Sequence, residues 1–212
     1  HGANRLGSNS LAELCVFGKV AGEEAARFAR EAGEGNAGAL ERQAGEIEQS
    51  ALAILTREGG GDRLATIREA MGATMEEGVG IFREASWMQR SCDTLAELKE
   101  RHARAHLDDR SRAFNTEWLS AIELGFQLDV AEAMAWSALR REESRGAHKR
   151  LDQFRDRDDR NFLKHTLAYR QEGGAPRLDY ETVNITRLPP AERVYGGAAK
   201  AAAEKQAEGA EA

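Results

Sequence analysis

Apolar residues recur every three or four positions over most of the first 145 residues, and this spacing constrains the fold more than any other feature of the sequence. In the stretch from 10 to about 31 the apolar positions are Leu11, Leu14, Val16, Phe17, Val20, Ala21, Ala25 and Phe28. A repeat of this length predicts an amphipathic helix. Its first half is the more apolar, so we expect that half to be the buried end.

The same spacing predicts four further helices, at about 38–57, 62–77, 86–105 and 115–145. Asp62 is expected to cap the second of these and either Asn115 or Thr116 the last, while the third is expected to start at Ser86. Gly125 is a candidate kink in the last helix, and Gly146 is expected to end it. Short connections and little strand signal predict that 38–145 forms an antiparallel helical bundle.

Breaks in this pattern predict the domain organisation. The glycine-rich run at 32–38 indicates a linker. Further on, two β-rich runs at 162–169 and 177–185 enclose Gly173-Gly174 and predict a β-hairpin. We therefore expect a mainly α chain: the end of one domain at 1–31, the bundle at 38–145, a small α+β domain with the hairpin at 146–196, and a frayed Ala/Glu/Lys tail at 197–212.

Composition excludes several classes of protein. The formal net charge is -6, and the 30 Lys and Arg are interleaved with 36 Asp and Glu, which argues against a nucleic-acid surface. Cys15 and Cys92 have no CxxC or metal spacing and are interpreted as small buried hydrophobes without a disulfide. No apolar run approaches the roughly 20 residues that span a bilayer, so we expect any membrane association to come through a partner.

The opening residues, 1–11, form a glycine-containing loop before the first helix. Ser8, Asn9 and Ser10 compete as its N-cap, and Glu13 completes a capping-box pattern with Ser10. Unpaired N–H groups at such a helix start attract anions, and Arg5 carries a planar fork suited to a carboxylate or phosphate. The residues alone fit an anion site, but taken without further context they favour an ordinary capped helix with a surface arginine.

The segment HGANRLGSNSLAELCVFGKVAGEEAA resembles the closing part of the flavin-binding domain in the succinate dehydrogenase/fumarate reductase flavoprotein family. SNSLAEL and the later LPPAERVYGG are most similar to the bacterial fumarate reductase branch. ESRGAH, followed by an R-x-D pattern and RDD, is also similar to the family's sequences. The resemblance covers residues 1 to about 196, and the chain opens without Met inside a domain, so we expect a C-terminal fragment of a longer protein.

The resemblance implies roles for four residues of the opening loop. Arg5 is expected to bind a carboxylate of the dicarboxylate substrate, with help from the backbone N–H of Ser8. Ser10 and Leu11 are expected to meet FAD near N1 and the C2 carbonyl of the flavin ring. The catalytic acid and the histidine that attaches FAD covalently are expected upstream, so this fragment alone should be inactive and should not retain FAD.

The function that the resemblance implies is reduction of fumarate to succinate by hydride transfer from FAD in anaerobic respiration. The implied partners are an iron-sulfur subunit and membrane anchor subunits, which would hold the protein at the cytoplasmic face of the bacterial inner membrane. Three alternatives stay open: succinate dehydrogenase, which runs the same half-reaction in reverse, the more distant L-aspartate oxidase, and a non-catalytic helical docking module.

The charged run from Glu143 to Asp159 allows two interpretations, an ion-pair network or a solvated face. The family resemblance favours a structural joint that holds the bundle, the last domain and the flavin domain in register.

The sequence contains five histidines, at positions 1, 102, 106, 148 and 165. His102 and His106 lie four apart, but no third ligand accompanies them, so no metal site is predicted. His148 and His165 are expected to be structural hydrogen-bond donors, and His1 to line the flavin pocket.

Overall fold

The computed structural model describes residues 9–58, 60–171 and 173–187. Contacts divide the chain into two units, His1–Glu181 and Thr182–Ala212, and only 182–187 of the second are described. The predicted tail at 197–212 therefore lies outside the described residues, as do His1, Arg5 and Ser8.

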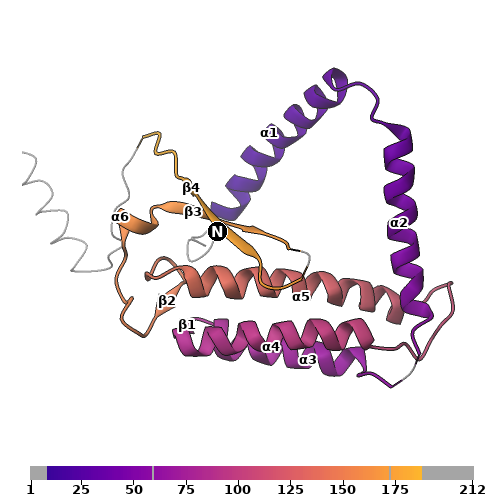
Figure 1. Ribbon diagram of the computed structural model, residues 1–212. Helices are drawn as coiled ribbons and strands as arrows, with labels where there is room; N and C mark the ends of the chain where they lie inside the picture. The colour runs from indigo at the N-terminus through magenta and orange to yellow at the C-terminus, as the bar shows by residue number, and fades with distance from the viewer. Residues whose placement is uncertain (1–8, 59, 172, 188–212) are drawn as a thin grey trace, which may run out of the picture. The chain divides into compact units, whose positions relative to one another are not determined.

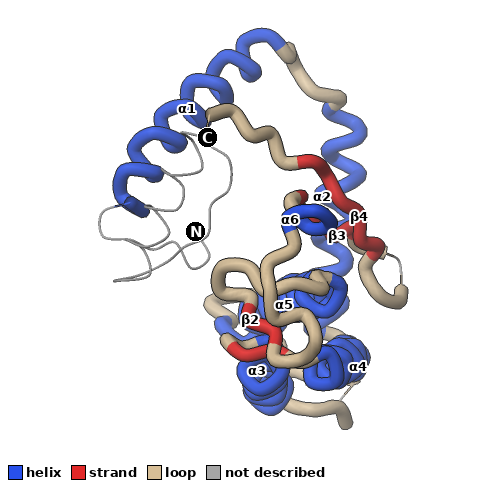
Figure 2. The backbone as a smooth tube through the Cα atoms, turned by 90° about the vertical axis from the view of Figure 1, so that its left-hand side faces the viewer, coloured by secondary structure: helices blue, strands red, loops and turns tan. Residues whose placement is uncertain are grey.

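The described part of the chain is mainly helical, as the sequence predicts (Figures 1 and 2). The helices are α1 (Asn9–Glu31), α2 (Ala37–Leu55), α3 (Leu64–Val79), α4 (Ala85–Arg104), α5 (Thr116–Arg140) and α6 (Asp159–Phe162). The strands are β1 (Phe82–Arg83), β2 (Lys149–Arg150), β3 (Lys164–Tyr169) and β4 (Arg177–Thr182).

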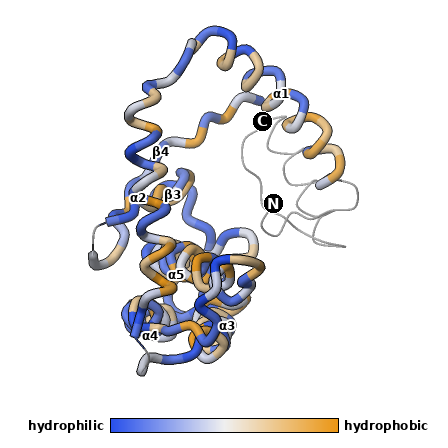
Figure 3. Tube along the Cα trace, turned by 90° about the vertical axis from the view of Figure 1, so that its right-hand side faces the viewer, coloured by the Kyte–Doolittle hydropathy of each residue, from blue (hydrophilic) through white to orange (hydrophobic). Residues whose placement is uncertain are grey.

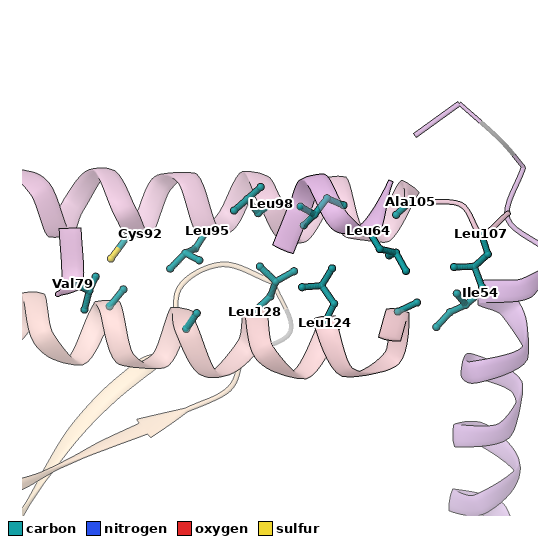
Figure 4. Close-up of a cluster of buried hydrophobic side chains, with 14 of the residues drawn as sticks. Ile54, Leu64, Val79, Cys92, Leu95, Leu98, Ala105, Leu107, Leu124 and Leu128 are labelled. Atoms are coloured by element: carbon teal, nitrogen blue, oxygen red, sulfur yellow. The ribbon is translucent and has the colours of Figure 1, made fainter. Parts of the chain in front are cut away.

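Helices α3, α4 and α5 pack side by side in alternating directions and enclose the hydrophobic core (Figure 1). In Figure 4, Leu95 and Leu98 of α4 point toward Leu124 and Leu128 of α5, and all four side chains are fully buried. Burial of a leucine side chain contributes about 1.5–3 kcal/mol, so these facing rows of leucine hold the bundle together.

Helix α2 joins this core at its end, through the buried Ile54 and Leu55 and the partly buried Leu52. Leu40 and Ile47 share the helical spacing of the buried Ile54, yet Ile47 is 69% exposed and Leu40 is also exposed. The core of the bundle is therefore made by three helices, and the earlier turns of α2 present their apolar side chains to solvent.

Helix α1 also differs from expectation. Its apolar residues gather in its first half (Figure 3), but Leu14 is 69% exposed and Phe17 is 64% exposed. The space beside Gly18 and Gly22 is also open, since a Cβ placed on either glycine would meet no heavy atom within 4 Å. The described residues place no second apolar surface against this stripe, so the expected burial is not seen within them and stays a prediction.

One of the predicted helix caps is confirmed and another was wrong. Asn115 caps α5 as predicted, since its side-chain oxygen accepts a hydrogen bond of 2.7 Å from the backbone N–H of Trp118. The prediction for Asp62 was wrong: α3 follows Arg63, and the Asp62 carboxylate instead accepts a 2.7 Å hydrogen bond from Arg101 Nε. Helix α4 begins at Ala85, one residue before the predicted start at Ser86.

Two glycines have roles other than those predicted. Gly125 neither kinks nor divides α5, which is continuous. A Cβ there would lie 3.1 Å from Cε1 of His102, so glycine makes room for that imidazole. Helix α5 ends at Arg140, and Gly146, with φ of +60°, lies beyond it between Arg145 and His148, whose backbone groups pair. This left-handed conformation suits glycine because it has no Cβ.

The described strands form two small sheets. Strands β3 and β4 are neighbours, which confirms the hairpin, and Gly173 and Gly174 both have positive φ in the connection. Strands β1 and β2 pair in parallel, with Phe82 opposite Lys149 and Arg83 opposite Arg150. The second pairing was not predicted from the sequence. None of the described helices combines the length and the apolar character needed to cross a membrane.

Candidate functional site

The opening loop, which carries the predicted substrate residues, lies mostly outside the described residues. Arg5 and Ser8 are not described, whereas Ser10 and Leu11 lie in the first turn of α1. Because α1 begins at Asn9, Asn9 and Ser10 are inside the helix. Ser10 therefore does not act as the N-cap, and the predicted capping box was wrong on that point.

The described start of α1 fits an electron-rich ligand. The helix has 23 residues, and its first turn contains no acidic side chain. The N–H groups of a first helical turn lack intrahelical partners, and the helix dipole places positive charge there. Ser10 is partly buried and Leu11 is exposed. A flavin edge that becomes negative on reduction matches these donors, so the residues present fit FAD.

A buried ion-pair network occupies the predicted joint. Glu143 is 0% exposed. Its carboxylate accepts hydrogen bonds from Arg145 Nε at 2.7 Å, from Arg145 Nη2 at 3.0 Å, from Arg141 Nε at 3.0 Å and from the backbone N–H of Asp158 at 2.8 Å. A buried carboxylate needs such partners, because desolvation of an unpaired charge is costly. The network is confirmed; its predicted contact with a flavin domain stays a prediction.

Arg150 forms a second buried pair beside the first. It is 1% exposed, and its Nη2 lies 2.6 Å from Oδ2 of Asp152. Its Nη1 donates to the carbonyl oxygens of Leu139 and Arg141, and its guanidinium lies 5.0 Å from the centre of the Phe154 ring. Burial opposes ionisation of Asp152, but its hydrogen bonds from Arg150 and from two backbone N–H groups hold the pKa below its usual value.

Arg141 connects the end of α5 to the hairpin. Its Nη1 donates to Oγ1 of Thr166 at 2.9 Å, and its Nη2 donates to the carbonyl oxygen of Phe162 at 2.6 Å. The guanidinium also lies 5.7 Å from the centre of the Phe162 ring. One side chain therefore joins the bundle, the Glu143 network and the start of β3.

His148 lies buried between Arg83 and the end of α5. Its Nε2 is 3.0 Å from the carbonyl oxygen of Arg141, so Nε2 carries the proton and donates. Its Nδ1 is 2.7 Å from Nη1 of Arg83 and must accept. Burial, and then the charges of Arg83, Arg150 and Arg141, lower the pKa of His148. The expectation of a structural histidine is met, with one nitrogen donating and the other accepting.

The other described histidines do not form a metal site. His102 Nε2 donates to the carbonyl oxygen of Ala121 at 2.8 Å, and burial lowers the pKa of this imidazole. Nδ1 of His106 is buried without a hydrogen-bond partner, and His165 is exposed on β3. Within the described ranges, no three His, Cys, Asp or Glu side chains gather closely enough to hold a metal ion.

Two hollows, of about 690 and 870 Å³, share Lys99 and Arg170 in their walls. Lys99 Nζ lies 2.7 Å from Glu132 and 2.9 Å from Asp129, and Arg170 lies 3.5 Å from the same Asp129. Burial opposes the charge of Lys99, but its hydrogen bonds to the two carboxylates raise its pKa. Because Lys99 already pairs with two carboxylates, its charge is neutralised and it is poorly suited to bind an anionic substrate.

Cys92 is equally unsuited to catalysis. It is buried in the core, and burial, followed by the charges of Asp93 and Glu132, raises the pKa of its thiol to about 12. A thiol with such a pKa stays protonated near neutral pH and is a poor nucleophile. The described residues thus supply a scaffold and a buried joint, while the predicted substrate chemistry belongs to the opening loop.

Sequence reasoning missed Arg83 and Arg141, which both contact the joint. Arg141 immediately follows the last turn of α5, but its side chain donates to Phe162, Lys164 and Thr166 and not to the carbonyl groups of that turn, so its position gave no signal of this role. Arg83 carries no signal either, because its partner His148 lies 65 positions further along the chain.

The fold and the joint together correspond to a known class of flavoprotein module. Residues 68–195, more than half of the chain, match the family model described as "Fumarate reductase flavoprotein C-term". The chain belongs to this flavoprotein family, whose members are oxidoreductases.

Two relatives show how the chain compares with named flavoprotein subunits. The chain is 57% identical over 98% of its length to the fumarate reductase flavoprotein subunit of Escherichia coli strain K12, and it spans 34% of that protein. A succinate dehydrogenase flavoprotein subunit of Rickettsia bellii is 35% identical over 92% of the chain, which spans 33% of that subunit. The chain thus spans about a third of the length of the curated relatives it matches.

A solved structure supports the same assignment. A substituted form of the Escherichia coli quinol fumarate reductase FrdA superposes with a TM-score of 0.87 at 56% identity, covering 93% of this chain and 34% of that one. The similarity therefore extends over the helical bundle, the joint and the hairpin, and it favours the fumarate reductase branch over succinate dehydrogenase.

Proposed function

We propose that the whole protein is the flavoprotein subunit of a fumarate reductase, which reduces fumarate to succinate. The single observation that carries this proposal is the 57% identity, over 98% of this chain, to a protein named fumarate reductase flavoprotein subunit. The start of α1 supports it, since its first turn presents backbone donors without a competing carboxylate. Within this proposal, the 212 residues are the C-terminal third of the flavoprotein subunit.

The opening loop supplies one wall of the active site in this proposal. Arg5 binds one carboxylate of the dicarboxylate through its planar fork, and the backbone N–H of Ser8 adds a further donor. Ser10 and Leu11, at the positive end of α1, contact the flavin edge and stabilise negative charge there. When bound, FAD supplies the hydride, and the group that supplies the proton lies upstream of these residues.

Partners and localisation follow from the same proposal. An iron-sulfur subunit brings electrons to the flavoprotein, and membrane anchor subunits hold the complex at the cytoplasmic face of the inner membrane. The match to a structure named quinol fumarate reductase supports a multi-subunit respiratory complex. In this proposal the end of the FAD domain lies at 1–31, the bundle at 38–145, the small domain at 146–196 and a tail at 197–212.

Arg5→Lys in the full-length enzyme tests the proposed site. Lysine keeps the charge but loses the bidentate fork, so we expect fumarate binding to weaken by about 1.5–3 kcal/mol, roughly 10- to 100-fold in KM. Arg27→Lys is the matched control, because Arg27 lies exposed on α1 and pairs only with nearby glutamates. Near-normal fumarate affinity and turnover in Arg5→Lys would refute the role of Arg5.

Succinate dehydrogenase activity is the second candidate, because a named succinate dehydrogenase subunit is also similar to this chain. Fumarate reduction and succinate oxidation are to be compared in the same purified complex with low- and high-potential quinones. Faster succinate oxidation under both conditions would reverse the proposed direction. The isolated 212-residue chain should show no flavin absorbance after purification, and stoichiometric flavin would contradict the assigned upstream attachment site.

A further inference from the structure

The Arg83–His148 contact joins two segments that are far apart in sequence. Arg83 belongs to β1, in the connection between α3 and α4, and His148 directly precedes β2, beyond the end of α5. We propose that Arg83 and His148 form a pH-operated latch, which holds β1 against β2 while the imidazole is neutral and releases it when the imidazole takes up a proton.

The geometry admits only one protonation state. Nε2 of His148 donates to the carbonyl oxygen of Arg141, so the ring's only free lone pair is on Nδ1, which accepts from Arg83 Nη1 at 2.7 Å. A protonated imidazole has N–H groups on both nitrogens and no acceptor. Protonation would thus place two donors and two positive charges against each other, 2.7 Å apart, inside the protein.

Two further hydrogen bonds hold the same contact closed, in addition to the pairing of β1 with β2. The backbone N–H of Leu151 donates to the carbonyl oxygen of Arg83 at 2.8 Å, and the backbone N–H of Ala85 donates to Oδ2 of Asp152 at 3.0 Å. Each of β1 and β2 has only two residues. A pairing this short depends on its side-chain contacts, because an isolated two-stranded pair is marginal in water.

The charges around His148 all oppose its protonation or are already paired. Arg83 faces it from β1, Arg150 from β2 and Arg141 from the end of α5. The nearby carboxylates are occupied, Glu143 by Arg141 and Arg145, and Asp152 by Arg150. No described carboxylate is hydrogen-bonded to the His148 ring itself, since both of its nitrogens have other partners.

The sign of the pH effect follows from this arrangement. The folded-state pKa of His148 lies below the unfolded value of 6.5. The unfolded chain therefore binds the proton more readily, and the latch loses stability as pH falls below the unfolded value toward the folded one. Near neutral pH the latch is closed.

Hydrogen exchange in the full-length flavoprotein tests the latch. Backbone exchange is measured by mass spectrometry at about pH 7.5 and about pH 5, and each rate is divided by the intrinsic rate of an unstructured peptide at the same pH. We expect the corrected rate for peptides covering 82–85 and 148–152 to rise about tenfold or more in acid, while peptides from the core of α4 and α5 change little. An unchanged corrected rate at both segments would overturn the proposal.

Two variants separate the latch from a general acid effect. His148→Gln keeps a donor for the Arg141 carbonyl but cannot take up a proton, so its exchange should no longer respond to acid. His165→Gln, at the exposed histidine of β3, is the matched control and should respond like the wild type. A full acid response at 82–85 and 148–152 in His148→Gln would overturn the proposal.

Arg83→Met supplies an independent arm should His148→Gln fail to fold. It removes the positive charge that faces Nδ1, so the imidazole should protonate more easily. The folded and unfolded pKa values of His148 then lie closer together, so the acid response at 82–85 and 148–152 should be smaller than in the wild type. An acid response as large as that of the wild type would show that Arg83 does not control the contact.

Discussion

Arg145 binds both oxygens of the fully buried Glu143 carboxylate, Nε to Oε1 at 2.7 Å and Nη2 to Oε2 at 3.0 Å. Two parallel hydrogen bonds of this kind are the strongest arrangement between a guanidinium and a carboxylate. Because Arg145 also bonds Asp159 at 2.6 Å, the pair ties the end of α5 to the start of α6.

Glu143→Gln should destabilise the chain by about 3 kcal/mol, because it removes the buried negative charge that Arg141 and Arg145 share and leaves them without a counter-ion. Urea unfolding followed by circular dichroism measures the change. Glu142→Gln is the control, since Glu142 is the exposed neighbour and should change stability by less than about 0.5 kcal/mol. Equal effects at both positions would show that the buried network contributes nothing specific.

Gly78→Ala should destabilise the bundle by about 1–3 kcal/mol, whereas Gly72→Ala in the same helix should stabilise it by about 0.5–1 kcal/mol. A Cβ on Gly78 would overlap Oγ of Ser91 and lie 2.9 Å from the carbonyl oxygen of Trp87, so α3 could no longer approach α4 as closely. A Cβ on Gly72 would meet nothing within 4 Å. Thermal unfolding of both variants compares them, and a stabilised Gly78→Ala would refute the close approach.

Leu98→Ala should cost about 2–5 kcal/mol, because it opens a cavity between α4 and α5, where Leu98 is fully buried. Leu119→Ala is matched in chemistry, but Leu119 is exposed on α5 and its truncation should cost less than about 1 kcal/mol in this 212-residue chain. Denaturant midpoints of the two variants give the comparison. Similar losses would contradict the three-helix core.

Cysteine labelling reports on the same core. In the native 212-residue chain, iodoacetamide at about pH 7.5 should modify Cys15, which is exposed, and leave Cys92 unmodified. Burial shields the Cys92 thiol and raises its pKa to about 12. Intact mass and peptide mapping should show one adduct before unfolding and two in urea. Native labelling of Cys92 would indicate that the bundle opens readily.

Local signals were sufficient for most of the helices and for the hairpin. The 3.6-residue repeat located α1, α4 and α5 to within a few residues, and the Asn115 cap was readable because its partner is only three residues away. The same local reasoning failed where a partner lies far along the chain. Asp62 looked like a cap but binds Arg101, which is 39 positions away.

For the candidate site, too, local features could be predicted from the sequence and long-range ones could not. The motif in the opening loop was readable because its residues are contiguous, and it identified Arg5, Ser8, Ser10 and Leu11 as the residues to test. Burial was not readable: the apolar stripes of α1 and of the core helices look alike in sequence, yet Phe17 is exposed and Leu98 is fully buried.

The sequence by itself determined the helical class, the hairpin and the family motif, because each depends on residues a few positions apart. The tertiary structure decided which charged residues are structural. Arg83 and His148, 65 positions apart, meet only because the α3–α4 connection folds against the segment beyond α5. Long-range contacts of this kind, and not any local pattern, decide which arginines and carboxylates of the charged run are buried. Burial then requires them to be paired, because desolvation of an unpaired charge is costly.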